Sequence, residues 1–278
     1  MTYIVHGATG AQGAPVAAAL LAAGHYVTAA VRNPATYSGD AVAVNLGDVD
    51  SLAAAYSGAE GVFVHLPLGS AAQQHEHATT ILAAVEQAKP GRVVFSTSGY
   101  ELGDSDDSPH GTLSRGLLAS SVSAVTVAPK LYLENLLLPP VTEAARGRGV
   151  LLYPIRDDYA VSWSSHLDVA DVAMRLFDRT DITGVVTVGA LPGLLGDDLA
   201  AGFSRHLGRD VTFEAQTPDE FGDMVTPLFG VDGIAPVVDS YRWRATQPSE
   251  LIDENTSAQR VLDMHPRTVE QWLHAVNA

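Results

Sequence analysis

A glycine-rich stretch near the start of the chain constrains its fold more than any other feature. An apolar segment ending at Val5-His6 runs directly into Gly7-Ala8-Thr9-Gly10-Ala11-Gln12-Gly13, and an alanine-rich segment follows. This spacing is typical of a strand-to-helix turn that binds a dinucleotide, because its glycines permit a tight bend, close approach of a pyrophosphate and close helix packing. The positive end of the helix dipole then faces the phosphates. The residues expected at the ligand are Gly7, Thr9, Gly10, Ala11, Gln12 and Gly13.

Apolar strand-like segments alternate with helical segments through the first half of the chain. Strands that are apolar throughout and alternate with helices indicate a parallel sheet covered on both faces. Beyond residue 129 the alternation becomes irregular, although an amphipathic helix at 167–179 and a strand at 184–188 follow. We therefore predict an α/β fold, with a Rossmann-type doubly wound parallel sheet and a smaller mixed α/β C-terminal lobe on the substrate side. The predicted strands of the first half are 4–6, 25–31, 41–45, 61–65, 92–96 and 124–128, with helices at 14–23, 50–56, 70–89 and 112–120.

The end of the second predicted strand indicates which dinucleotide is bound. An NAD site places an acidic residue about 20 residues past the glycine turn, whereas an arginine accommodates the 2′-phosphate of NADP. Arg32 occupies this position, and no acidic residue follows until Asp40. A guanidinium can form paired hydrogen bonds with a phosphate, which a carboxylate would repel. The pattern favours NADP(H) over NAD(H), the alternative being a surface arginine without a ligand.

Three other strand ends carry candidate cofactor-binding residues. Asp48 follows the third strand, where it can bind the adenine amino group, cap the next helix, or do both. The backbone of His65-Leu66-Pro67, after the fourth strand, is expected beside the ribose and pyrophosphate. Ser96 and Thr97 close the fifth strand, where their hydroxyls either hydrogen-bond a carbonyl group of the ligand or form a turn.

Charge and composition exclude several classes of function. The formal net charge of −16 argues against nucleic acid or an anionic membrane as a partner. The chain has no cysteine, which excludes disulfides and thiolate catalysis and fits a reducing cytoplasm. No apolar run is long enough to span a bilayer, and no signal peptide is recognised, so we expect a cytoplasmic protein. His75 and His77 do not form a metal pair, because side chains two residues apart on a helix point to different faces. No metal is expected.

The glycine turn and five later segments resemble the NmrA-like family of atypical short-chain dehydrogenases/reductases. The resemblance covers nearly the whole chain, with the segments in the order of the family. It implies NADP(H) binding by a reductase such as the quinone reductases of the family, or by a redox-sensing regulator without turnover. The five segments are Val31-Arg32-Asn33-Pro34, Asn45-Leu46-Gly47-Asp48, residues 126–136 around Tyr132-Leu133-Glu134-Asn135, residues 165–173 around Asp168, and residues 266–273.

The chain departs from this family in its acid–base residues. Its only lysines are Lys89 and Lys130, and neither follows a tyrosine by four residues, so the Tyr-x-x-x-Lys motif of ordinary short-chain dehydrogenases is absent. The lysine that several reductases of the family carry before strand six is also missing. We expect His110, Lys130, Tyr100 or water to transfer any proton, with His110 in a loop before the predicted helix at 112–120. Tyr132 and Asn135 are expected to line the substrate side of the nicotinamide, and Trp243 is expected either to close the substrate pocket or to pack within the C-terminal part.

These observations predict an NADPH-dependent oxidoreductase that passes hydride to a small conjugated carbonyl compound such as a quinone or an enone. Hydride addition to such a substrate gives a stabilised anion, which a site with weak proton donors can accommodate. The alternative is a regulatory binding protein that senses NADP(H) and reports to a protein partner. Residues 1–150 are predicted to form the cofactor domain. Residues 151–278 form mostly a substrate or lid region, with about 165–190 returning to the core. Both a monomer and a homodimer remain open.

Overall fold

The computed structural model describes residues 2–103 and 106–278. The chain divides into two compact units. The first comprises Met1–Pro129, His166–Val188 and Asp253–Met264, and the second comprises Lys130–Ser165, Gly189–Ile252 and His265–Ala278. The second unit thus begins at Lys130, directly after the sixth strand, whereas the sequence placed the division near residue 150.

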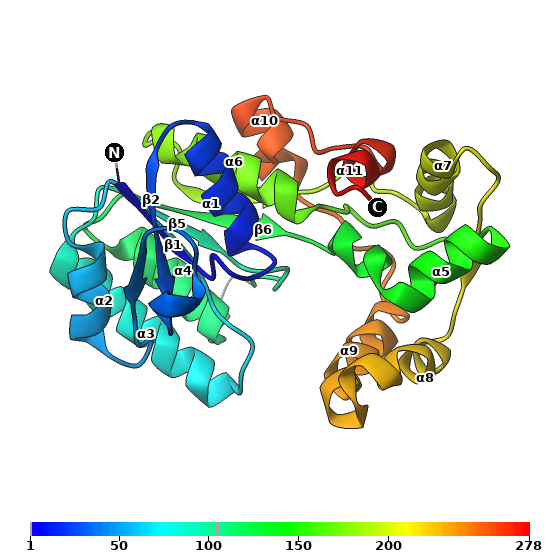
Figure 1. Ribbon diagram of the computed structural model, residues 1–278, viewed down its shortest axis with the longest axis horizontal. Coiled ribbons are helices and arrows are strands. Elements are labelled where there is room, and N and C mark those ends of the chain that lie inside the picture. The colour runs from blue at the N-terminus through cyan, green and yellow to red at the C-terminus, as the bar shows by residue number, and fades with distance from the viewer. Residues whose placement is uncertain (1, 104–105) are drawn as a thin grey trace. The chain divides into compact units, whose positions relative to one another are not determined.

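A seven-stranded parallel sheet forms the centre of the first unit (Figure 1). Its strands follow the order β3-β2-β1-β4-β5-β6-β8. All six neighbouring pairs are parallel, and β1 lies between β2 and β4. This order confirms the predicted Rossmann-type fold, whose ligands bind beyond the carboxyl ends of the strands where the strand order reverses. The strands are β1 Thr2–His6, β2 Tyr26–Val31, β3 Ala41–Ala43, β4 Gly61–His65, β5 Val93–Ser96, β6 Ala124–Pro129 and β8 Gly184–Val188.

Helices cover both faces of this sheet. On one face α1 packs against α6, and on the other α3 packs between α2 and α4 (Figure 1). The core on the α2–α4 face is aliphatic and aromatic, with Val64 and Phe95 from the sheet meeting Ile81 and Leu113 from the helices. The helices are α1 Gly13–Ala22, α2 Val49–Tyr56, α3 Ala71–Ala88, α4 Pro109–Ala119, α6 His166–Asp178 and the short α10 Ala258–Leu262.

Helix α4 begins earlier than the sequence predicted. Its N-cap is Ser108, whose hydroxyl accepts a hydrogen bond from the N–H of Gly111 at 3.0 Å. Pro109 occupies the first helical position, where its missing N–H costs nothing. The first turn of α4 therefore includes His110, and the expectation that this histidine lies in a loop was wrong.

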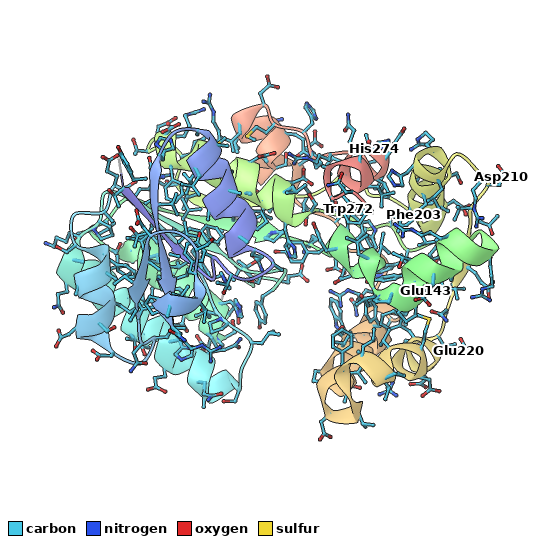
Figure 2. The ribbon with its side chains drawn as sticks, viewed as in Figure 1. Glu143, Phe203, Asp210, Glu220, Trp272 and His274 are labelled. Atoms are coloured by element: carbon cyan, nitrogen blue, oxygen red, sulfur yellow. The ribbon has the colours of Figure 1, made fainter. Side chains whose placement is uncertain are left out.

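The second unit is a smaller mixed α/β assembly, as predicted. Strand β7 Val150–Tyr153 pairs in parallel with β9 Thr212–Ala215, and α11 packs against α7. Trp272 of α11 lies near Phe203 of α7 (Figure 2), and its indole N–H donates to Glu134 at 3.1 Å. The helices are α5 Pro139–Arg148, α7 Gly196–Leu207, α8 Pro218–Phe229, α9 Val231–Arg244 and α11 Val269–Ala275. Among the helices of residues 2–103 and 106–278, none combines the length and hydropathy required to cross a bilayer.

Candidate functional site

The glycine turn between β1 and α1 has the geometry that its sequence requires. Gly7 adopts a left-handed conformation, with φ at 63°, and its carbonyl accepts a hydrogen bond from Gly10 at 2.7 Å. A Cβ atom at Gly13 would overlap the carbonyl groups of His6 and Gly7. Only glycine allows α1 to start this close to β1, so the N-terminus of the helix lies directly behind the turn.

The side chain of Gln12 joins this turn to the end of β5. Gln12 occupies the N-cap position of α1 but makes no capping hydrogen bond. Its Oε1 instead accepts a hydrogen bond from the hydroxyl of Ser96 at 2.9 Å. The Ser96 hydroxyl in turn accepts from the backbone N–H of Ser98 at 3.2 Å. Two predicted cofactor-binding residues therefore hold each other in place across the carboxyl edge of the sheet.

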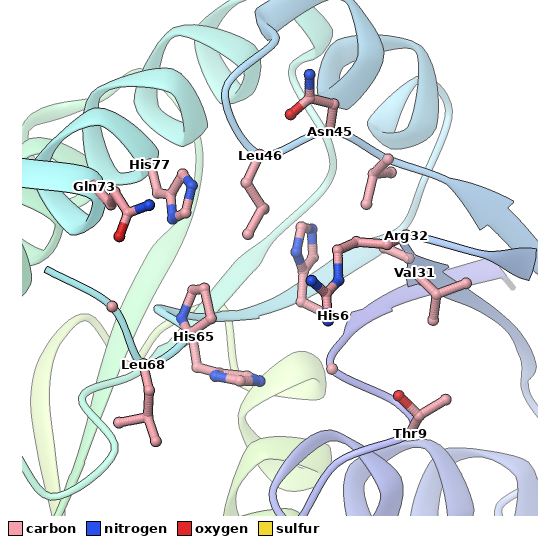
Figure 3. A pocket seen from close by; sticks show the side chains of 15 residues that line it. His6, Thr9, Val31, Arg32, Asn45, Leu46, His65, Leu68, Gln73 and His77 are labelled. Atoms are coloured by element: carbon pink, nitrogen blue, oxygen red, sulfur yellow. The ribbon is translucent and has the colours of Figure 1, made fainter. Parts of the chain in front are cut away.

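A cavity of about 660 Å³ lies at this edge (Figure 3). It is bounded by the end of β1, the ends of β2 and β3, the loop after β4 and the first turns of α3. Of the predicted cofactor-binding residues, Gly7, Thr9, Arg32, His65 and Pro67 line it. The other lining residues are His6, Ala30, Val31, Val44, Asn45, Leu46, Leu68, Gly69, Gln73 and His77.

Arg32 follows directly on β2, and its side chain points into this cavity (Figure 3). The side chain is exposed, and within residues 2–103 and 106–278 it forms no hydrogen bond or ion pair. Of the described residues that line the cavity, none carries a carboxylate. The uncompensated guanidinium makes this end of the cavity suited to an anion.

Asp48 and Leu66 have structural roles outside the cavity lining. Asp48 is the N-cap of α2, and one carboxylate oxygen accepts from the N–H groups of Asp50 at 3.0 Å and Ser51 at 3.2 Å. Leu66 is buried in the core, and its carbonyl oxygen lies 3.4 Å from Nδ1 of His65. The helix-capping interpretation of Asp48 accounts for its observed contacts.

Buried polar atoms without partners gather at the carboxyl ends of β4 and β5. His65 and Ser96 are neighbours in the register of these two strands. Among the described residues, no partner is found for Nε2 of His65, Oγ1 of Thr97, Oγ of Ser98 or Nδ1 of His110. Since buried polar groups in folded proteins nearly always have hydrogen-bond partners, these atoms indicate a site for a polar ligand.

His110 and Tyr100 form an aromatic pair next to these strand ends. Their rings are parallel, with centroids 4.6 Å apart and an interplanar angle of 7°. His110 is buried whereas Tyr100 is 41% exposed. Burial lowers the pKa of His110 to about 4, partly offset by Asp106, so the imidazole is neutral at pH 7. A neutral imidazole donates or accepts a hydrogen bond but is a weak proton donor.

The sequence model of the NmrA-like family matches residues 1–273. The chain belongs to the NmrA-like family. This confirms the resemblance carried by the glycine turn and the five later segments. The same fold is found in solved structures that are similar over nearly their whole lengths.

Three of these structures illustrate the range of proteins that share the fold. An NADPH-dependent quinone oxidoreductase from Escherichia coli, complexed with NADPH, is 20% identical, with 100% of both chains covered and a TM-score of 0.76. Triphenylmethane reductase from Citrobacter sp., complexed with NADP(H), is 16% identical, with 99% of this chain and 100% of that chain covered and a TM-score of 0.78. A nucleoside-diphosphate-sugar epimerase from Staphylococcus aureus is 18% identical, with coverages of 98% and 99% and a TM-score of 0.75.

The remaining predicted site residues of this NmrA-like protein lie in its second unit. Lys130 is the first residue of that unit, and Tyr132 forms a β-bridge with Ser164. The backbone N–H of Asn135 donates a hydrogen bond to the carbonyl oxygen of Tyr132 at 3.1 Å. Trp243, on α9, is 49% exposed. None of these residues lines the cavity described above in the first unit.

Several cavity residues were not predicted from the sequence. Asn45 and Leu46 belong to a segment that carries the family resemblance, but only Asp48 was selected from it. Gln73 and His77 are four residues apart on α3 and therefore share one face of the helix. That spacing, directly after the loop of the fourth strand, is the signal that could have identified them. Among the described residues, no group of three or more metal-ligating side chains is found.

Proposed function

We propose that the cavity of the first unit binds NADP(H). The observation that carries this proposal is Arg32, a cation without a partner among the described residues. It points into a cavity whose described lining has no carboxylate. A 2′-phosphate supplies the missing anion, whereas the hydroxyl of NAD would leave the guanidinium unpaired. Similar structures named as complexes with NADPH and NADP(H) support the same assignment.

The residues around the cavity fit such a cofactor. The backbone of the glycine turn lies at the N-terminus of α1, and a Cβ atom at Gly7 or Gly13 would overlap His65 or the backbone of the turn. The bare backbone at this helix N-terminus fits a pyrophosphate. The volume of about 660 Å³ is in the usual range for ligand pockets. Beyond the glycine turn, the unpartnered atoms of Thr97 and Ser98 provide hydrogen-bonding groups for the nicotinamide end.

For the reaction, we infer reduction of a small conjugated carbonyl compound such as a quinone or an enone. Bound NADPH would supply a hydride, which together with one proton converts a quinone into a hydroquinone and leaves NADP⁺. The side chains of this chain contribute binding more than acid catalysis, because His110 is buried and neutral. A substrate whose reduced form is a stabilised anion does not need a strong acid catalyst, since water can deliver the proton.

A second candidate is a binding protein that senses the NADP(H) ratio and has little turnover. The observation that favours it is the weak acid–base chemistry near the strand ends. His110 is neutral there, and the lysine that several reductases of the family carry before strand six is missing. Such a protein would act through a protein partner rather than through a small-molecule substrate.

A kinetic screen separates the two candidates. The measurement is loss of dihydronicotinamide absorbance with NADPH, and in parallel with NADH, across quinones, enones, aldehydes and simple ketones. We expect NADPH-dependent turnover of quinones or enones. Turnover of ketones without quinones would contradict the reaction class. Tight binding of both NADPH and NADP⁺, without turnover of any substrate in the panel, would favour the sensor.

A further inference from the structure

His65 presents an unpartnered nitrogen to the glycine turn. It is the last residue of β4 and lines the cavity (Figure 3). Its imidazole packs so closely on Gly7 that a Cβ atom there would overlap Nε2. This nitrogen is buried and has no hydrogen-bond partner among the described residues. The imidazole therefore has one ring nitrogen available where the backbone of the turn is left bare.

The other ring nitrogen determines the tautomer of His65. Nδ1 lies 3.4 Å from the carbonyl oxygen of Leu66, and a carbonyl can only accept a hydrogen bond. A hydrogen bond between these two atoms places the proton on Nδ1, which leaves a lone pair on Nε2 of the neutral imidazole. In this form Nε2 repels a phosphate oxygen. Only the doubly protonated ring can donate to Leu66 and to an anion at the same time.

The groups that face His65 determine its charge in the free protein. His6 from β1, His110 from α4 and His166 from α6 interact with it electrostatically, and Asp106 acts on His110. Arg32 and His77 line the same cavity, whose described lining has no carboxylate. Burial lowers the pKa of His65, so the free protein holds it neutral at pH 7. A negative ligand would reverse this balance.

We propose that His65 is a ligand of the dinucleotide pyrophosphate and takes up one proton from solvent when the dinucleotide binds. This inference rests on the proposed function, because it requires NADP(H) in the cavity. The added proton goes to Nε2, which then donates to a phosphate oxygen while Nδ1 keeps its bond to Leu66. Binding of NADP(H) therefore strengthens as the pH falls. His65 thus couples cofactor binding to pH, without contacting the reacting carbon atoms.

The test is calorimetry of NADPH binding in two buffers that differ in ionisation enthalpy, which counts the protons taken up. The proteins are the wild type, His65→Gln and a control, His75→Gln. Glutamine can donate an N–H to a phosphate but cannot take up a proton. His75 lies on α3 with His77 but does not line the cavity. A second ligand, adenosine 2′-monophosphate, carries the titrating 2′-phosphate but no pyrophosphate, so the protons that it exchanges can be subtracted.

We expect the wild type and His75→Gln to take up protons with NADPH beyond those exchanged with adenosine 2′-monophosphate. His65→Gln should not. From about pH 8 to about pH 6, the ratio of wild-type to His65→Gln affinity should rise by up to about 100-fold, because the uptake of one whole proton changes the affinity about tenfold for each pH unit. If His65→Gln does not fold, His65→Asn takes its place in the comparison, because asparagine also cannot take up a proton.

Three results would count against the inference. Equal proton uptake by the wild type and His65→Gln, or a wild type that takes up no extra proton with NADPH, overturns it and leaves NADP(H) binding intact. Absence of NADPH binding to the wild type at every pH overturns the proposed function itself. The two failures are therefore distinguishable.

Discussion

The hydroxyl of Ser96 donates to Oε1 of Gln12 at 2.9 Å, and this bond joins the carboxyl end of β5 to the glycine turn. The two residues are 84 positions apart in the sequence. The bond fixes the Gln12 side chain at the N-terminus of α1, where it cannot turn back to cap the helix. The start of α1 is thereby left open to a ligand.

Replacing Ser96 by alanine should weaken NADPH binding about fivefold, because the loss of one hydrogen bond of about 1 kcal/mol frees the Gln12 side chain. Titration of intrinsic fluorescence with NADPH measures the change. The control is Ser240→Ala, which removes an exposed hydroxyl that bonds within its own helix. An unchanged dissociation constant in Ser96→Ala would show that the bond does not organise the turn.

Replacing Arg32 by aspartate should reverse the cofactor preference. We expect NADPH affinity to fall roughly 10- to 100-fold, the range for losing a hydrogen bond to a charged group, while NADH affinity stays or improves. Dissociation constants for both cofactors test this. Arg175→Asp makes the same charge change at an exposed position of α6 that does not line the cavity. If Arg32→Asp kept the wild-type preference, the 2′-phosphate assignment would be wrong.

Gly13→Ala should destabilise the first unit by about 1–3 kcal/mol or more, because the new methyl group meets the backbone of His6 and Gly7. The matched substitution Gly147→Ala lies within α5, where a Cβ atom meets nothing within 4 Å. It should raise stability by about 0.5–1 kcal/mol, the usual gain of alanine over glycine in a helix. Urea unfolding of both variants measures the contrast. Equal effects would contradict the packing argument.

The buried imidazole of His110 should make the protein sensitive to acid. Burial lowers its pKa from 6.5 to about 4, so the folded state binds fewer protons than the unfolded state. Its contribution to stability is therefore complete above about pH 6.5 and is lost as the pH falls toward 4. His110→Gln should flatten the pH dependence of the unfolding free energy by up to about 1.4 kcal/mol per pH unit in this window. Urea unfolding at several pH values provides the test, and an identical slope in both proteins would refute it.

The sequence predicted the first unit well because its signals are local. Apolar strands alternate with helices, and caps such as Asp48 and Ser70 mark where α2 and α3 begin. Strand β7 and helix α9 were missed for a physical reason. β7 has four residues, and α9 contains Pro236 and polar residues, so neither shows a clear period of its own. Both are stabilised by contacts with distant segments.

The candidate site was predictable only where it is continuous in sequence. The glycine turn and Arg32 follow known spacings, so their position at the cavity could be anticipated. The burial of His110 could not be anticipated. It depends on the ring of Tyr100, in the preceding loop, and on the residue at which α4 begins. The tautomer of His65 likewise depends on one backbone carbonyl, which no spacing reveals.

The interleaving of the two units affects how the chain folds during translation. The sheet of the first unit is completed by β8, which pairs with β6, yet residues 130–165 of the second unit are synthesised between them. On the ribosome, the edge of β6 that faces away from β5 therefore has no neighbouring strand until residues 184–188 emerge. An uncovered apolar edge is a template for pairing with another chain. Nascent chains that stop near residue 150 should therefore aggregate and require a chaperone.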